Sequence, residues 1–252
     1  MNNISQISVF DYREIEILGD LERIKLFFEN LDDKELCESL ENERKNGRND
    51  YPVRVMLNLI YAMKIFGHRS VESFRRELSR NSQLRALCGL SDGKFKFLGE
   101  RKNLVPPARV FSGFIRKLKK HENEIKNINE KLIKYMYENL EDFGKDCAID
   151  GKFLDTYANH YSKEKCVDNR AEHDATNSCK TYYMKDGTTK KEWHYGFRAH
   201  IICDAKYGLP IKYKLTPANN SEQTELDNLL KELASNDDER YKFEKMENLM
   251  GD

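Results

Sequence analysis

The spacing of apolar residues changes at Gly144, and this change constrains the fold more than any other feature of the 252-residue sequence. Before Gly144, apolar residues recur every three or four positions, which is the period of helices packed on a core. After it, short apolar runs and alternating segments are bounded by glycine, proline and asparagine, which is typical of strands. A helical segment followed by a strand-rich one predicts an α+β protein with two domains, residues 1–144 and 145–252.

The helical half carries recognisable start and stop signals. Residues 21–47 predict two short amphipathic helices, and residues 53–66 predict a central helix that is apolar on most sides. Ser70 and Asn81 are N-cap residues that start two further short helices, and Gly89 ends the second of them. Such a pair resembles a helix-turn-helix, but an ordinary helical bundle with a solvated basic face is an equally open interpretation.

Positive charge is concentrated in one part of a chain whose formal net charge is zero. Residues 101–120 contain seven lysines and arginines and no acid, mostly on the first third of one long helix expected to run from Pro107 to about Leu140. DNA phosphates would suit this surface, although a solvated face is the more common meaning of such a run. The candidate DNA-binding residues are Arg75, Arg76, Arg109, Arg116, Lys117, Lys119 and Lys120.

Composition excludes several classes of protein. Apolar residues make up 39% of the chain and it contains 13 Phe and 13 Tyr, which is too many for a disordered polypeptide. The first residues lack the basic start and apolar core of a signal peptide, and no apolar run is long enough to span a membrane. Six scattered cysteines do not have the spacing of a secreted disulfide framework, so we expect a cytoplasmic protein with no membrane partner.

Two aspartates follow apolar runs in the second half. Cys147–Ile149 lead into Asp150, and Met246–Met250 lead, through a glycine, into Asp252. We expect Gly151 to relax the backbone where the first strand ends, so that Asp150 is presented at the tip of that strand. Two carboxylates that a fold brings together are suitable ligands for Mg²⁺, a hard cation that prefers oxygen.

Other polar residues of this half are better explained without chemistry. Asp155, after the expected turn, and Asp204, at the end of a neighbouring strand, fit solvated or turn-forming roles, and His200 fits a packed or hydrogen-bonded one. Residues 156–195 predict a loop or small hairpin, in which the cysteines and histidines lack the spacing of a zinc site. Residues 197–216 then predict an antiparallel hairpin, before a helix after Ser221 and a last strand.

Several short motifs in this half occur together in an order that resembles the bacterial insertion-sequence DDE transposases, whose catalytic domain is ribonuclease-H-like. The motifs are Ala148–Phe153, His194–Ala205, Gly208–Ile211, Thr216–Asn219 and Met250–Asp252. Three helical segments also resemble the amino-terminal domain of that family, namely Tyr51–Leu57, Gly67–Ser70 and Asn81–Gly89. The resemblance covers about residues 15–252, and the ordered run is far more specific than any single motif.

The resemblance implies cut-and-paste transposition, in which double-stranded DNA at the transposon ends is cleaved and joined with two Mg²⁺ ions, or Mn²⁺ as a substitute. Carried over by motif, Asp150 is the first catalytic and metal-binding carboxylate and Asp252 the second. The full-length family implies a possible homo-oligomer. Because the family pattern continues past the second aspartate to a catalytic glutamate, we expect this chain to be truncated and inactive by itself. Two alternatives remain open, a non-catalytic DNA-binding or regulatory protein and an unrelated metal-dependent nuclease.

Overall fold

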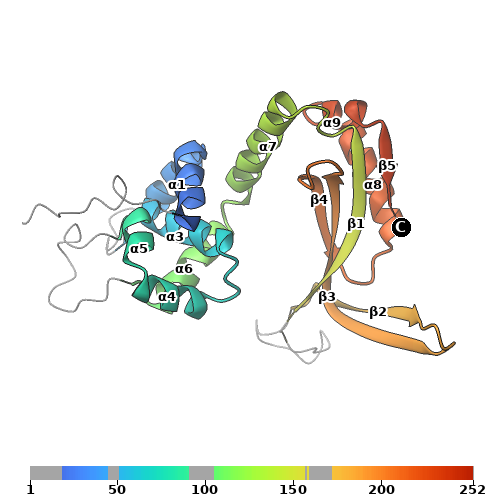
Figure 1. The fold of residues 1–252 in the computed structure, drawn as a ribbon, viewed down its shortest axis with the longest axis horizontal. Helices are drawn as coiled ribbons and strands as arrows, with labels where there is room; N and C mark the ends of the chain where they lie inside the picture. The colour runs from blue at the N-terminus through green and yellow to red at the C-terminus, as the bar shows by residue number, and fades with distance from the viewer. Residues whose placement is uncertain (1–18, 45–50, 91–104, 157, 159–171, 252) are drawn as a thin grey trace, which may run out of the picture. The chain divides into compact units, whose positions relative to one another are not determined.

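The computed structural model describes residues 19–44, 51–90, 105–156, 158 and 172–251. These residues form helices followed by a mixed sheet with helices, which confirms the expected α+β class (Figure 1). The chain divides into two compact units, residues 1–130 and 131–252. The division lies inside helix α7 (Glu122–Asn139), upstream of residue 144, because the last turns of this helix pack on the core of the second unit through Met136, Tyr137 and Leu140.

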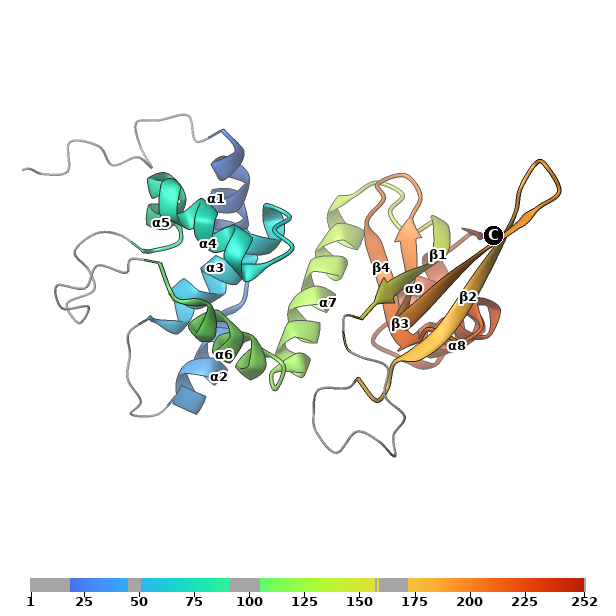
Figure 2. The ribbon, with the colours of Figure 1, turned by 90° about the horizontal axis from the view of Figure 1, so that it is seen from below.

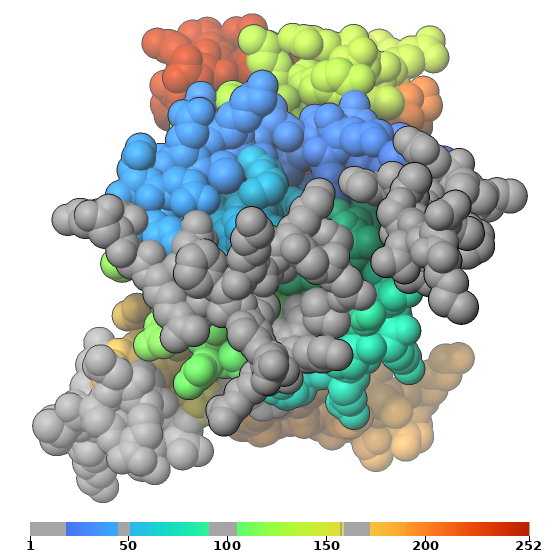
Figure 3. All heavy atoms as spheres, turned by 90° about the vertical axis from the view of Figure 1, so that its left-hand side faces the viewer, coloured from blue at the N-terminus to red at the C-terminus, as the bar shows by residue number. Residues whose placement is uncertain are grey.

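The first unit is built around α3. The two helices expected in residues 21–47 and the central helix are all present, and α3 buries Leu57 and Leu59 completely. On the face shown in Figure 3, α3 is visible only as a narrow strip beside α1 and α2. The helices of this unit before α7 are α1 (Asp20–Asn30), α2 (Lys34–Arg44), α3 (Val53–Ile65), α4 (Val71–Arg80), α5 (Ser82–Leu87) and α6 (Ala108–Leu118).

Both predicted N-caps are confirmed. The backbone N–H of Ser73 donates to Ser70 Oγ at 3.1 Å, and that of Leu84 donates to Asn81 Oδ1 at 2.9 Å. These bonds satisfy donors that the first turn of a helix leaves unpaired, so α4 and α5 begin where the sequence predicted. Only Asn81 separates the two helices.

The expectation of one long helix from Pro107 to Leu140 is wrong. Helix α6 ends at Leu118 and α7 begins at Glu122. Between them, His121 Nδ1 lies 3.1 Å from Glu124 Oε1 and His121 Nε2 lies 3.1 Å from Glu43 Oε2 in α2. Lys120 also donates to Glu43, at 3.0 Å. The break is therefore stabilised by a contact with a distant helix, which helical periodicity cannot reveal.

The second unit is a sheet whose central order is β4-β3-β1-β5, and β2 pairs with the first half of β3. Strand β1 is antiparallel to β3 and parallel to β5. The expected hairpin, the helix after Ser221 and the last strand are all present. The elements are β1 (Asp146–Asp155), β2 (Thr176–Tyr183), β3 (Thr189–Asp204), β4 (Pro210–Pro217), α8 (Glu222–Ser235), α9 (Arg240–Lys245) and β5 (Asn248–Met250).

Helix α8 covers one face of this sheet. Leu229 and Leu233 are fully buried against Cys147, Ile202 and Ile211 from three strands. The opposite face is more open among the described residues and exposes three large apolar side chains, Leu154, Tyr213 and Leu215. Figures 1 and 2 both show that the hairpin of β2 and β3 extends beyond the rest of the sheet, which confirms the hairpin expected within residues 156–195.

Candidate active site

Asp150 lies in the middle of β1, so the expected glycine turn after it is wrong. Strand β1 continues to Asp155, and Gly151 pairs with His200 in the ladder with β3. Asp150 itself pairs with Ile201. Asp155 is the last residue of the strand rather than a residue beyond a turn.

Gly151 lies directly under the side chain of Glu222. A Cβ atom at this position would lie 2.5 Å from Glu222 Oε1 and 3.4 Å from Arg198 Cδ. The nearest atoms belong to the end of the side chain of Glu222, the first residue of α8, which lies over the strand directly after Asp150. The small size of glycine leaves this side chain room to lie beside Arg198, a role that depends on the tertiary fold.

Asp150 is exposed and lies on the sheet face opposite α8, since its neighbour Ile149 faces a cavity that α8 lines. The pKa of the Cys203 thiol is raised, mainly by burial and secondly by the negative charge of Asp150. The second effect indicates that this thiol lies near the Asp150 carboxylate. Within the described residues, Asp150 has no hydrogen bond or ion pair. Its carboxylate is thus available to a ligand from solvent.

The parallel pairing of β1 with β5 determines what can lie beside Asp150. Cys147 pairs with Leu249 and Ala148 with Met250. The Asn248 side chain donates to Asp146 Oδ1 at 2.8 Å. These two residues are 102 positions apart in the sequence, as are the residues of each strand pair. Asp252 lies outside the described residues, so its pairing with Asp150 at a shared metal stays a prediction.

The cavity beside this pair of strands is separate from the Asp150 carboxylate. Its volume is about 160 Å³, and it lies between β1, β5 and α8. The lining residues are Ile149, Glu222, Gln223, Leu226, Leu249 and Gly251. The carboxylate of Glu222 lies 3.5 Å from the Arg198 guanidinium. Sequence reasoning missed both residues; the available signal was the position of Arg198, two residues before His200 in an alternating strand.

A stacked set of side chains continues from Arg198 along the same face. The Arg198 guanidinium lies 4.2 Å from the centre of the Phe153 ring, and this ring stacks on His194 with centroids 4.2 Å apart. His194 Nδ1 lies 3.0 Å from Asp155 Oδ1. Asp155, the last residue of β1, therefore orients His194 of the neighbouring strand β3.

Asp204 and His200 have structural roles. Asp204 is buried and accepts backbone N–H bonds from Gly144 and Tyr207, each at 2.7 Å, so it forms the turn and is not solvated. His200 is fully buried, with Nε2 3.0 Å from Thr216 Oγ1, which confirms the packed, hydrogen-bonded interpretation. Burial lowers the pKa of His200, so it is neutral at physiological pH.

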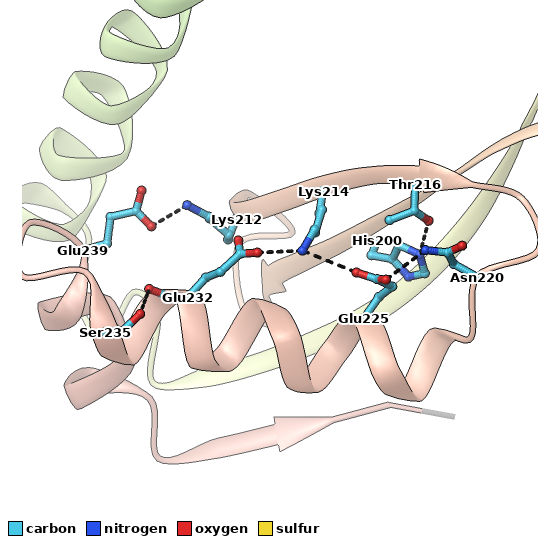
Figure 4. Close-up of polar contacts among 9 residues, drawn as sticks. All are labelled: His200, Lys212, Lys214, Thr216, Asn220, Glu225, Glu232, Ser235 and Glu239. Atoms are coloured by element: carbon cyan, nitrogen blue, oxygen red, sulfur yellow. Dashed lines mark hydrogen bonds and ion pairs between the residues drawn. The ribbon is translucent and has the colours of Figure 1, made fainter. Parts of the chain in front are cut away.

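Figure 4 shows how charged pairs join β4 to α8 beside His200. Lys214 reaches Glu232 at 2.6 Å and Glu225 at 3.4 Å, and Asn220 donates to Glu225 at 2.9 Å. Because Glu225 is largely buried and is paired with the half-buried Lys214, this network helps to fix the position of α8 over the sheet. The helix that carries Glu222 is thereby held in place.

The predicted DNA-binding residues differ in how free they are. Arg75 donates to the Pro106 carbonyl at 2.9 Å and pairs with Glu72, and Lys120 pairs with Glu43. Arg116 makes a long bond of 3.4 Å to its own helix. The others, Arg76, Arg109, Lys117 and Lys119, are exposed and have no ion pair with the rest of the described chain.

Helices α4 and α6, which carry Arg76 and Arg109, pack together through the edge-to-face rings of Phe74 and Phe111, 6.2 Å apart. Their exposed arginines thus belong to neighbouring helices of one unit. Sequence patterning found these cations but not the acids that neutralise some of them. DNA contact by this surface remains a prediction.

The central β4-β3-β1-β5 order, with three antiparallel strands and a parallel β5, is the ribonuclease-H-like arrangement expected from the sequence. Comparison with family models agrees in both halves. Residues 142–244 match the Transposase DDE domain, and residues 13–116 match the Transposase domain (DUF772). The chain therefore belongs to the insertion-sequence DDE transposases. No curated protein and no solved structure matched it.

The part of the chain that the structure describes has neither a preformed metal-ligand cluster nor a membrane-spanning helix. It contains no group of three or more histidine, cysteine, aspartate or glutamate side chains arranged to hold a metal ion. It also contains no helix that is long and apolar enough to cross a membrane. Of the two sequence-predicted catalytic residues, Asp150 lies within the described residues and Asp252 outside them.

Proposed function

We propose that this chain binds the ends of a mobile DNA element through its first unit and carries, in its second, Asp150 and Asp252, two of the carboxylates with which a DDE transposase cleaves and joins DNA phosphodiesters. The observation that carries the proposal is the pair of transposase domain matches, with the Transposase domain (DUF772) first and the Transposase DDE domain after it. The same assignment implies action in the cytoplasm, where a bacterial element finds its DNA.

The register of β1 and β5 supports Asp150 and Asp252 as partners. The paired positions of the two strands differ by 102 residues, as the hydrogen-bonded residues Asn248 and Asp146 show. Asp252 follows Asp150 by the same offset. In parallel strands, directly paired residues project to the same face, so a continued register would present both carboxylates together.

The one described residue of the proposed site, Asp150, is a suitable ligand for a divalent cation. Asp150 offers a solvent-facing carboxylate without a competing cation among the described side chains, and oxygen ligands of this type suit Mg²⁺ or Mn²⁺. Asp150 and Asp252 would hold the ion. When bound, such ions activate the attacking oxygen and stabilise the leaving oxygen of a phosphodiester. The protein's own contribution is to hold Asp150 rigid, through the ladder with β3 and the packing of α8 over Gly151.

The 252-residue polypeptide is proposed to bind DNA without cutting it. Sites of this kind work as a unit of several carboxylates, and losing one member costs orders of magnitude in rate. Among the described residues, Asp150 belongs to no group of three or more side chains that could hold a metal ion. Supercoiled plasmid incubated with the polypeptide and Mn²⁺ should stay intact. Nicking that disappears in Asp150→Ala would show that a working site forms and would overturn this proposal.

DNA binding by the first unit has its own test. Replacing Arg116, Lys117, Lys119 and Lys120 with Ala should weaken duplex binding about equally for all sequences and flatten its salt dependence, because phosphate contacts carry no base information. The affinity is measured by fluorescence anisotropy at several salt concentrations. Lys25→Ala/Lys126→Ala, which removes exposed lysines outside the block, is the control. Equal affinity of both variants would return α6 to the solvated-face interpretation.

A further inference from the structure

The hairpin arm, defined as Thr176–Tyr195, is a part of the second unit that contributes neither to the hydrophobic core of the sheet nor to the site around Asp150. It consists of β2 and the first half of β3, which pair with each other from Thr176–Gly196 to Tyr183–Thr189. Its side chains are mostly exposed, so it adds almost nothing to the hydrophobic core. In Figures 1 and 2 it projects beyond the other strands.

The arm exposes large aromatic side chains. Trp193, the single tryptophan of the sequence, is 71% exposed, and Tyr183 is 86% exposed. Trp193 pairs with Cys179, and Tyr183 pairs with Thr189 four positions further along the ladder, which is two rungs when only one face of the ribbon is counted. Since paired and alternate residues of a ribbon share a face, Trp193 and Tyr183 project from the same side. Two large exposed rings on one face of a ribbon that packs on no core make this face a candidate binding surface.

A lysine lies between the two rings. Lys191 pairs with Thr181 on the same face, one rung from Trp193 and one from Tyr183, and adjacent rungs on a face are about 6–7 Å apart. Lys180, Lys185 and Lys190 add positive charge to the arm. Its acids are Glu192, which is directly opposite Lys180, and Asp186, whose carboxylate accepts bonds from Thr188 in the turn.

We propose that this arm binds single-stranded DNA, with bases stacked on Trp193 and Tyr183 and a phosphate at Lys191. Aromatic platforms interleaved with positive charge are how proteins hold unpaired strands, because every base has a face to stack on. The inference rests on the proposed function, which supplies DNA as the partner. It adds a site in the second unit that is distinct from the basic residues of α6.

The position of the arm fits a strand leading to Asp150. The arm adjoins Gly196, which pairs with Asp155, while Asp150 pairs with Ile201 on the same strand β3. Five residues of strand span about 16–17 Å. The arm would therefore hold DNA several nucleotides from a phosphodiester at Asp150, as a guide for a separated strand would.

A second copy of this chain is a less suitable occupant. Lys191 is the charged strand residue on the face of Trp193 and Tyr183, and each arm has more lysines than acids, so like charges oppose a face-to-face contact of two arms. Among the described strands, β2 is an edge that pairs only with β3, and Lys180 on such an edge opposes the addition of another strand. Charge complementarity thus favours a polyanion over self-association.

Trp193 makes the proposal testable with the whole polypeptide, since the tryptophan fluorescence comes from this one residue. A short oligothymidine strand should quench this fluorescence in a saturable way, and the same strand annealed to its complement should quench it much less. Equal quenching by both forms would overturn stacking on unpaired bases. Absent quenching, while anisotropy shows that labelled DNA is bound, would overturn the arm as a contact and leave the proposed function intact.

Variants then assign the contact. Trp193→Ala and Tyr183→Ala should each weaken binding of a labelled single strand at least about fivefold by anisotropy, as expected for the loss of one stacked base. Tyr135→Ala, which removes an exposed tyrosine on α7, is the matched control and should leave the affinity unchanged. Loss of a dimer in sedimentation, without loss of DNA affinity, would assign the arm to self-association and overturn the proposal.

Discussion

Gly144 offers the sharpest test of how the second unit is assembled. It lies in the turn before β1, has a φ of 82°, and its N–H donates to the buried Asp204. A Cβ atom here would lie 2.5 Å from Tyr137 Oη and 2.6 Å from Tyr137 Cε1. The tyrosine ring cannot easily move, because it packs edge-to-face on Phe143 at 4.9 Å and on Tyr241 at 5.1 Å.

Gly144→Ala should therefore lower the free energy of unfolding through two separate effects. A left-handed backbone costs a residue with a Cβ atom about 1–2 kcal/mol, and forcing a methyl group into a packed site costs about 1–3 kcal/mol. The sum, about 2–5 kcal/mol, is a large part of the stability of a small domain. The chain offers a control for the first term, since Gly208 also has a positive φ, 66°, but nothing within 4 Å of its Cβ position.

Hydrogen exchange of β1 and β3 amides measures the opening free energy of the second unit by itself. Gly144→Ala should lower this free energy by about 1–3 kcal/mol more than Gly208→Ala does, the difference being the packing term. Tyr137→Ala should remove most of that difference when combined with Gly144→Ala, although it is costly by itself. Equal effects of the two glycine substitutions would refute the packing argument.

Two further predictions concern the first unit. Hydrogen bonds to Glu124 and Glu43 raise the pKa of His121 above 6.5, so the stability it contributes is complete at lower pH and is lost as the pH rises through the raised value. The resistance of this unit to urea should thus fall as the pH rises above about 6.5, the ordinary pKa of histidine, and through the raised pKa of His121. His121→Gln should remove that dependence, and an unchanged pH profile in the variant would contradict the assignment. Asp33 is 2% exposed and accepts two bonds of 2.7 Å from Arg54. Asp33→Ala should lower the free energy of unfolding, measured with urea, by about 1.5–3 kcal/mol. A decrease of less than about 1 kcal/mol, the range of exposed ion pairs, would show that the two charges are effectively solvated.

Sequence alone predicted the features whose causes are local. Ser70 and Asn81 begin helices because their side chains accept bonds from N–H groups three residues away, within the same turn. The β3–β4 hairpin and the last strand followed from alternation and turn residues, which are also short-range signals. The ordered motifs indicated the family, because a run of several matches is far less ambiguous than any single residue.

Tertiary structure decided the features that depend on contacts between distant segments. Gly151 resembles a turn residue in the sequence, yet it serves the close approach of Glu222 from α8. The break after α6 contains no proline or glycine, and its contacts to Glu43 come from a helix far upstream. The polar stretch that carries Trp193 gave no sustained period, because an arm exposed on both faces has no buried side to impose one. Periodicity reports burial against a core, so residues that act away from the core, or through a single long-range contact, are revealed only by the fold.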